Sequence, residues 1–158
     1  MAKRSKLSKP VFDEFVFWVT RPSVYYNFSL QHDRRIGDPF EERQSLRVLV
    51  ECIYPDRCKG RVADAAIMPD PDMSEGSKFR IRPPEEPPKA IGSIIVGKDR
   101  FEISVFLPPD ACWGLAAAMA NGTITSMSAG SHWPRPGHGY INSISFHGPD
   151  FDPVAYVG

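Results

Sequence analysis

The chain has 158 residues, of which 42% are hydrophobic and 11% aromatic, and its 19 basic side chains balance 19 acidic ones. This length and apolar content suit one domain with its own core. The zero net charge excludes a general attraction to nucleic acid or to an acidic membrane surface. We therefore expect neither nucleic acid nor membrane among the partners.

The first ten residues, MAKRSKLSKP, are basic, and the segment after them, FDEFVFWV, contains two acids. No apolar signal-peptide core or membrane span is present there. The three cysteines are odd in number and show neither disulfide nor zinc-site spacing. We predict a solvated tail over residues 1–10, a single β-rich domain over residues 11–158 and a cytoplasmic location.

Strands are predicted where apolar residues alternate with polar ones between the 16 prolines. In VYYNFSLQ the pattern places Val24 and Tyr26 on a buried face. In YINSISFH it groups Tyr140, Ile144 and Phe146, with Asn142 breaking the pattern. The clearest strands are residues 24–31, 45–54, 100–107 and 140–147, and weaker candidates are 12–20, 60–68, 78–82, 91–97 and 123–129. The sequence GKD (97–99) predicts a hairpin turn between the strands at 91–97 and 100–107.

One helix is predicted at residues 110–121, because a Pro-Asp start and an Asn-Gly stop enclose an Ala-rich segment. Helical spacing places Trp113, Ala116, Ala117 and Ala120 on one face. We expect Trp113 to anchor this helix in the core at one end of the sheet.

Together these elements predict a mainly β fold, an antiparallel β-sandwich or partly open barrel of about eight or nine strands with one short α-helix. The proline-rich segment at 82–90 is expected to be a stiff crossover between two groups of strands.

The stretch SHWPRPGHGYINSISFHG (131–148) carries three of the four histidines. If residues 140–147 form a strand, His138 and His147 lie about 30 Å apart, so His132, His138 and His147 cannot share a metal ion. A smaller site remains in a loop at 131–140. Its residues are His132, Trp133, Arg135, His138 and Tyr140. The alternative is that this loop only closes the barrel end, with Trp133 turned inward.

Other motifs do not indicate chemistry. Asp70, Asp72 and Ser74 have the first ligand spacings of an EF-hand, but Glu75 and Ile81 occupy the positions that need Gly and Glu. Nucleophile-elbow, P-loop, dinucleotide and zinc-protease motifs are absent from the sequence. We expect no cofactor and no metal.

The sequence therefore favours a binding module that presents residues 131–140 to a protein or small-molecule ligand. One alternative is a hydrolase or isomerase of a small substrate with His138 or His132 as general base near Tyr140. Another is a structural homo-oligomer that associates through strand edges or sheet faces. An enzyme should hold these side chains in a cleft with an acid in hydrogen-bond reach, whereas a binding module should show them on an open surface.

Overall fold

The computed structural model describes residues 11–30, 40–70 and 90–156. The elements in chain order are β1 (Val11–Leu30), β2 (Phe40–Tyr54), η1 (Asp56–Cys58), β3 (Val62–Pro69), β4 (Gly92–Val96), β5 (Phe101–Leu107), α2 (Pro109–Ala120), β6 (Ser126–Arg135), β7 (His138–His147) and α3 (Pro153–Tyr156). None of these helices is long and apolar enough to cross a membrane.

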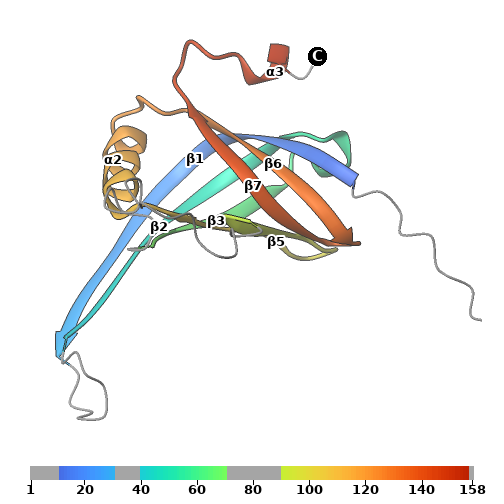
Figure 1. The fold of residues 1–158 in the computed structure, drawn as a ribbon. Helices are drawn as coiled ribbons and strands as arrows, with labels where there is room; N and C mark the ends of the chain where they lie inside the picture. The colour runs from blue at the N-terminus through green and yellow to red at the C-terminus, as the bar shows by residue number, and fades with distance from the viewer. Residues whose placement is uncertain (1–10, 31–39, 71–89, 157–158) are drawn as a thin grey trace, which may run out of the picture.

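The seven strands form one closed barrel in the order β1-β2-β3-β5-β4-β7-β6 (Figure 1). Neighbours are antiparallel except β3 and β5, which run parallel. The mainly β class and the short helix are confirmed, and the closed sheet is compatible with the predicted barrel. The predicted antiparallel pairing is wrong for β3 and β5, and the sandwich is not confirmed because a single sheet closes on itself. The predicted hairpin at 97–99 joins β4 to β5, and the Gly97 amide donates to the Arg100 carbonyl at 2.7 Å.

The barrel core follows the predicted alternation along β2 and β5, except at Tyr54, which shares the predicted face of β2 but is 37% exposed. The buried residues are Leu46, Val48, Val50 and Cys52 on β2, and Phe101, Ile103 and Val105 on β5. Phe15 and Phe17 of β1 stack inside the barrel with ring centroids 6.0 Å apart.

The strands β1 and β2 continue beyond the barrel as a two-stranded arm (Figure 1). The pairing of β1 with β6 ends at Trp18, and the pairing of β3 with β2 ends at Leu46. The prediction that Val24 and Tyr26 lie on a buried face is therefore wrong, since they are 52% and 51% exposed. Alternation identified the strand, but the arm extends past the part of the sheet that would cover that face.

The strand β7 contains an irregularity that reverses its alternation. Gly130 pairs with Ser143 while Ser131 pairs with Ile141, which leaves Asn142 as the extra residue of a β-bulge. Ile141 is consequently buried, and Tyr140 is 39% exposed. The prediction of a common buried face is therefore wrong for Tyr140. It holds for Ile144 and Phe146, which both contact the core.

The helix α2 packs on β1, β2 and β3 at one end of the barrel. Its buried residues are Cys112, Ala116 and Met119. The prediction of Trp113 as a core anchor is wrong, because its side chain is 44% exposed. The helix buries a different face from the one expected. Because the helix is rich in small alanines, its spacing fitted two overlapping faces equally well.

The other end of the barrel is covered by arginines. The Arg57 guanidinium lies over the Phe15 ring at 5.6 Å and over the Trp133 ring at 6.0 Å, and it pairs with Asp13 at 2.5 Å. The Arg61 guanidinium lies 5.2 Å from the Phe101 ring and donates to the Gly97 carbonyl at 2.6 Å. Cation–π and hydrogen-bond contacts close this end.

Several predicted features lie outside the described residues. They are the basic tail at 1–10, the strand at 78–82, the acidic turn beyond Asp70 and the proline-rich segment up to residue 89.

Candidate functional site

The predicted loop at 131–140 is a β-hairpin. The strand β6 extends to Arg135 and β7 begins at His138, so only Pro136 and Gly137 form the turn. Gly137 has a φ of 76°, a left-handed conformation that favours glycine. The Val96 amide donates to the Gly137 carbonyl at 3.0 Å, which ties the turn to β4. The five predicted site residues are therefore held on paired strands, where alternation decides the face that each presents.

Trp133 points into the barrel end. Its ring centroid lies 5.8 Å from that of Phe15, and it packs against the core. Gly139 provides the space for this ring, since a Cβ there would lie 3.0 Å from Trp133 Cε2. The indole Nε1 is buried without a hydrogen-bond partner. Of the five predicted residues, Trp133 is thus the one separated from the others.

The remaining four lie on the outer face of the barrel. The His132 and Tyr140 ring centroids are 5.4 Å apart, and those of His138 and Tyr140 are 5.6 Å apart. Arg135 Nη2 lies 3.4 Å from His138 Nδ1. The antiparallel register of β6 and β7 creates this group, because His132 pairs with Tyr140 and Arg135 pairs with His138.

Phe12 joins the same face and was missed from the sequence. It pairs with His132 in the β1–β6 register, with ring centroids 6.2 Å apart, and its side chain is 71% exposed. We call Phe12, His132, Tyr140 and His138 the ring row. Only the long-range pairing of β1 with β6 places Phe12 there, so no local sequence signal could have indicated it.

The imidazoles of the ring row lack the environment of a general base. Asn142 Nδ2 lies 2.9 Å from His132 Nδ1, so the amide donates to this ring nitrogen. Within the described ranges, no carboxylate makes a hydrogen bond or ion pair with His132 or His138. An orienting acid, as in a Ser-His-Asp arrangement, is not found beside them.

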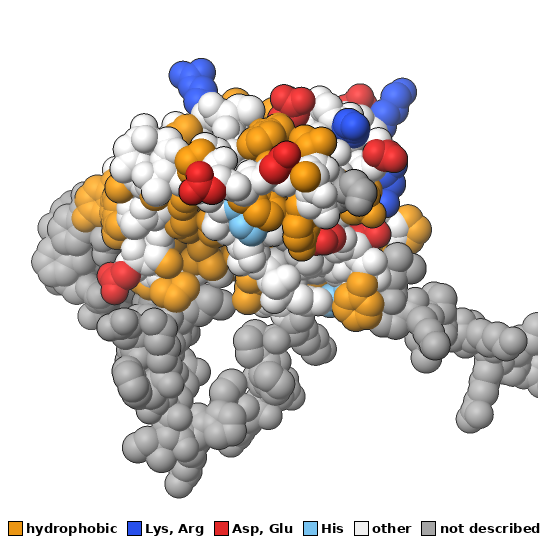
Figure 2. All heavy atoms as spheres, turned by 90° about the horizontal axis from the view of Figure 1, so that it is seen from above, with side chains coloured by type: hydrophobic (Ala, Val, Ile, Leu, Met, Phe, Trp, Pro, Cys, Tyr) orange, Lys and Arg blue, Asp and Glu red, His pale blue; other side chains and the backbone are white. Residues whose placement is uncertain are grey.

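A shallow hollow adjoins the ring row between β1, β6 and β7. It is lined by Phe12, Asp13, Glu14, Gly130, Ser131, Asn142 and Ser143. The bulge and the missing side chain of Gly130 open this hollow, since a Cβ at Gly130 would lie 2.5 Å from Ser143 Oγ. On its far side the Tyr156 hydroxyl donates to Glu14 at 3.0 Å. Figure 2, which looks onto the molecule from above, shows histidine side chains bordered by hydrophobic and acidic groups.

Two further chemical groups lie elsewhere. Ser128 Oγ and His147 Nε2 are 3.1 Å apart, with Phe151 stacked on the imidazole at 3.9 Å, but Ser128 is only 8% exposed. Burial raises the pKa of the Cys52 thiol to about 12 and also raises the pKa of Cys112. The thiolate that a cysteine nucleophile needs is therefore disfavoured at both cysteines.

No protein-family model, curated protein or solved structure matches this chain. The function is consequently inferred from the geometry of the site itself.

Proposed function

We propose that the protein is a binding module that contacts a protein partner through the ring row and Arg135. The observation that carries this proposal is the exposure of Phe12, whose ring is 71% solvent-accessible and adjoins two histidines and a tyrosine. A phenylalanine that is so exposed contributes little to the barrel core, so packing does not explain it.

The composition and rigidity of this surface support the proposal. Aromatic side chains and arginine are enriched among residues that anchor protein interfaces. The ring row lies on β1, β6 and β7, three strands paired within a closed barrel. Side chains on such a framework lose less conformational entropy on binding than side chains on a mobile loop.

Arg135 favours a partner with an acidic segment. Of the two acids that line the adjoining hollow, Asp13 pairs with the Arg57 guanidinium, and Glu14 accepts a hydrogen bond from the Tyr156 hydroxyl. An acidic peptide segment that presents an apolar side chain to Phe12 would complement this surface.

An open surface supports a protein partner over a small molecule, since small-molecule sites bury most of their ligand. The enzyme alternative, with His132 or His138 as general base, is less favoured because no described carboxylate makes a hydrogen bond or ion pair with either ring. We keep a cytoplasmic location in the proposal, because all three cysteines are free.

The proposal is tested with the double variant Phe12→Ser/Tyr140→Ser and the matched control Val62→Ser. Val62 is 55% exposed on β3 and lies outside the ring row, so it controls for the loss of exposed apolar surface. Each protein is immobilised and exposed to a native extract, after circular dichroism has confirmed equal folding. We expect wild type and Val62→Ser to retain a common partner that the double variant loses.

Direct contact is tested by a photo-crosslinking phenylalanine analogue placed at position 12 or at position 62. The proposal requires that position 12 crosslinks to the same partner and that position 62 does not. Equal capture by the double variant, or equal crosslinking from both positions, would overturn it.

A further inference from the structure

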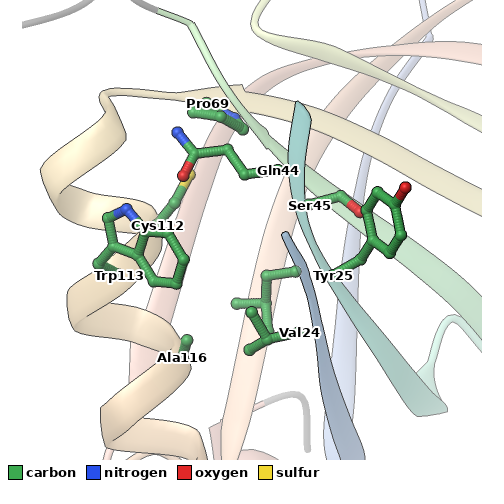
Figure 3. A pocket seen from close by; sticks show the side chains of 9 residues that line it. Val24, Tyr25, Gln44, Ser45, Pro69, Cys112, Trp113 and Ala116 are labelled. Carbon is green, nitrogen blue, oxygen red and sulfur yellow. The ribbon is translucent and has the colours of Figure 1, made fainter. Parts of the chain in front are cut away.

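Two hollows of different chemistry lie on opposite faces of β1 and β2 at the base of the arm. Figure 3 shows Val24 directed toward α2 and Tyr25 turned away from it. The crevice on the α2 side is mostly apolar, and none of the residues that line it is charged. The hollow on the outer face is lined by Arg21, Ser23, Arg47, Val48, Leu49 and Asp64. We call it the arginine hollow, because its charged groups can recognise an ionic ligand.

The register of β1, β2 and β3 brings the polar groups of the arginine hollow together. Arg21 pairs with Leu49, which pairs in turn with Asp64 on β3. Ser23 pairs with Arg47 in the neighbouring row. Paired residues of antiparallel strands point to the same face, and diagonal neighbours lie about 7–8 Å apart, within reach of long side chains. Arg21 and Arg47 are therefore diagonal neighbours on the outer face, with Ser23 beside them.

Asp64 orients Arg47 without using all of its donors. Arg47 Nε lies 3.3 Å from Asp64 Oδ1, and Arg47 Nη2 donates to Asp64 Oδ2. A guanidinium has five N–H donors, so others remain after this bidentate pair. The pair also neutralises a carboxylate that would repel an anion. Because Arg47 is already oriented, a ligand that binds it offsets less conformational entropy.

Arg21 supplies the uncompensated charge of the hollow. Within the described parts of the chain, it makes no hydrogen bond or ion pair. With two arginines and one aspartate, the hollow has a net positive charge. Leu49 adjoins these groups and is 41% exposed, so it offers an apolar surface next to the charge. A compact anion joined to an apolar group would complement this arrangement.

We propose that the arginine hollow binds a phosphate monoester, with the phosphoryl oxygens between Arg21 and Arg47 and the ester group on Leu49. A phosphate monoester has three terminal acceptor oxygens and close to two negative charges at neutral pH. It can accept hydrogen bonds from both guanidinium groups and from the Ser23 hydroxyl at once. A carboxylate has two oxygens and one charge, so it satisfies fewer of these donors.

The open shape of the hollow favours a phosphorylated side chain displayed by another protein. Arginine clusters are a recurring means of recognising such groups, and an open site buries only the end of its ligand. A small soluble ester presents the same chemistry, and the test below separates the two sources. The arginine hollow is separate from the ring row and does not depend on the proposed function.

The test is a titration of the isotope-labelled full chain with phenyl phosphate at low ionic strength, followed by amide chemical shifts. Shifts are expected in residues 21–23 and 47–49 and not in 131–142. Because exposed ion pairs contribute little in water, we expect a dissociation constant on the order of 1 mM. Arg21→Gln should weaken binding about tenfold, since it removes a charged donor. The matched control Lys59→Gln removes the same charge from an exposed position outside the hollow and should bind like wild type.

Two further probes address specificity and source. Benzoate should bind at least about fivefold more weakly than phenyl phosphate, because it has fewer oxygens and less charge. A short phosphotyrosine peptide that binds more tightly than phenyl phosphate would support a protein ligand, and equal affinity would support a small ester. Equal binding of phenyl phosphate by wild type and Arg21→Gln, equal losses in Arg21→Gln and Lys59→Gln, or equal affinity for benzoate would overturn the proposal.

Discussion

The inward position of Trp133 can be tested through Gly139, whose missing side chain makes room for the indole. A Cβ at Gly139 would lie 2.9 Å from Ile94 Cγ2 and 3.0 Å from Trp133 Cε2. Both are closer than side chains normally approach, so Gly139→Ala must displace one or both neighbours. Overpacking of this kind costs roughly 1–3 kcal/mol, and we expect the free energy of unfolding to fall by that amount.

The cost should be smaller when the indole is absent. In a Trp133→Leu background the contact at 3.0 Å is removed and only the contact with Ile94 remains. Urea unfolding of wild type, both single variants and the double variant should therefore give a coupling free energy of at least about 1 kcal/mol. Gly97→Ala is the matched control, because its Cβ would meet nothing closer than 3.7 Å, and it should be additive with Trp133→Leu.

Additivity of Gly139→Ala with Trp133→Leu within about 0.5 kcal/mol would refute the inward position. It would mean that the indole does not occupy the space beside Gly139. Trp133 would then belong with the other four predicted residues on the outer surface.

Three other predictions concern the fold. Burial raises the pKa of Cys52 to about 12, so the stability contributed by its protonated thiol is complete below pH 9 and is lost as the pH rises towards 12. The free energy of unfolding of wild type, measured in urea, should therefore fall relative to that of Cys52→Ala across this pH range. A constant difference between the two proteins would contradict the shift. Gly114→Ala should raise the free energy of unfolding by about 0.5–1 kcal/mol, since a Cβ there meets nothing within 4 Å, and an unchanged melting temperature would argue against a regular helix at this position. Arg57→Met removes the contacts with Phe15, Trp133 and Asp13 and should lower the free energy of unfolding by about 1 kcal/mol. The loss is small because the Arg57 side chain is 54% exposed. An unchanged thermal unfolding curve would show that these contacts do not stabilise the barrel end.

Local patterning predicted most of the fold. Alternation identified β2 and β5 together with their buried faces, and start and stop signals placed the helix at 110–121 where α2 spans Pro109–Ala120. These features depend on residues close in sequence, whose periodicity reflects burial directly. Closure of the sheet and the parallel pairing of β3 with β5 depend on which distant strands meet, and a single amphipathic pattern does not encode that.

The candidate site was predicted as a group of residues but not as a surface. The segment 131–140 was singled out by its composition, yet its folding as a hairpin separates Trp133 from His132 and Tyr140 by alternation. The bulge at Asn142 shifts the alternation of β7, and the pairing of β1 with β6 adds Phe12 to the face. Both effects arise from strand register, which is a long-range property of the sheet.

The most direct test of the account is hydrogen exchange by mass spectrometry on the protein alone and bound to the partner captured through position 12. We expect slower exchange on binding in peptides that cover residues 11–14 and 131–142, with the arm at 20–30 unchanged. Protection confined to the arm or to α2, with none at the β6–β7 hairpin, would contradict the claim that the outer face of this hairpin is the binding surface.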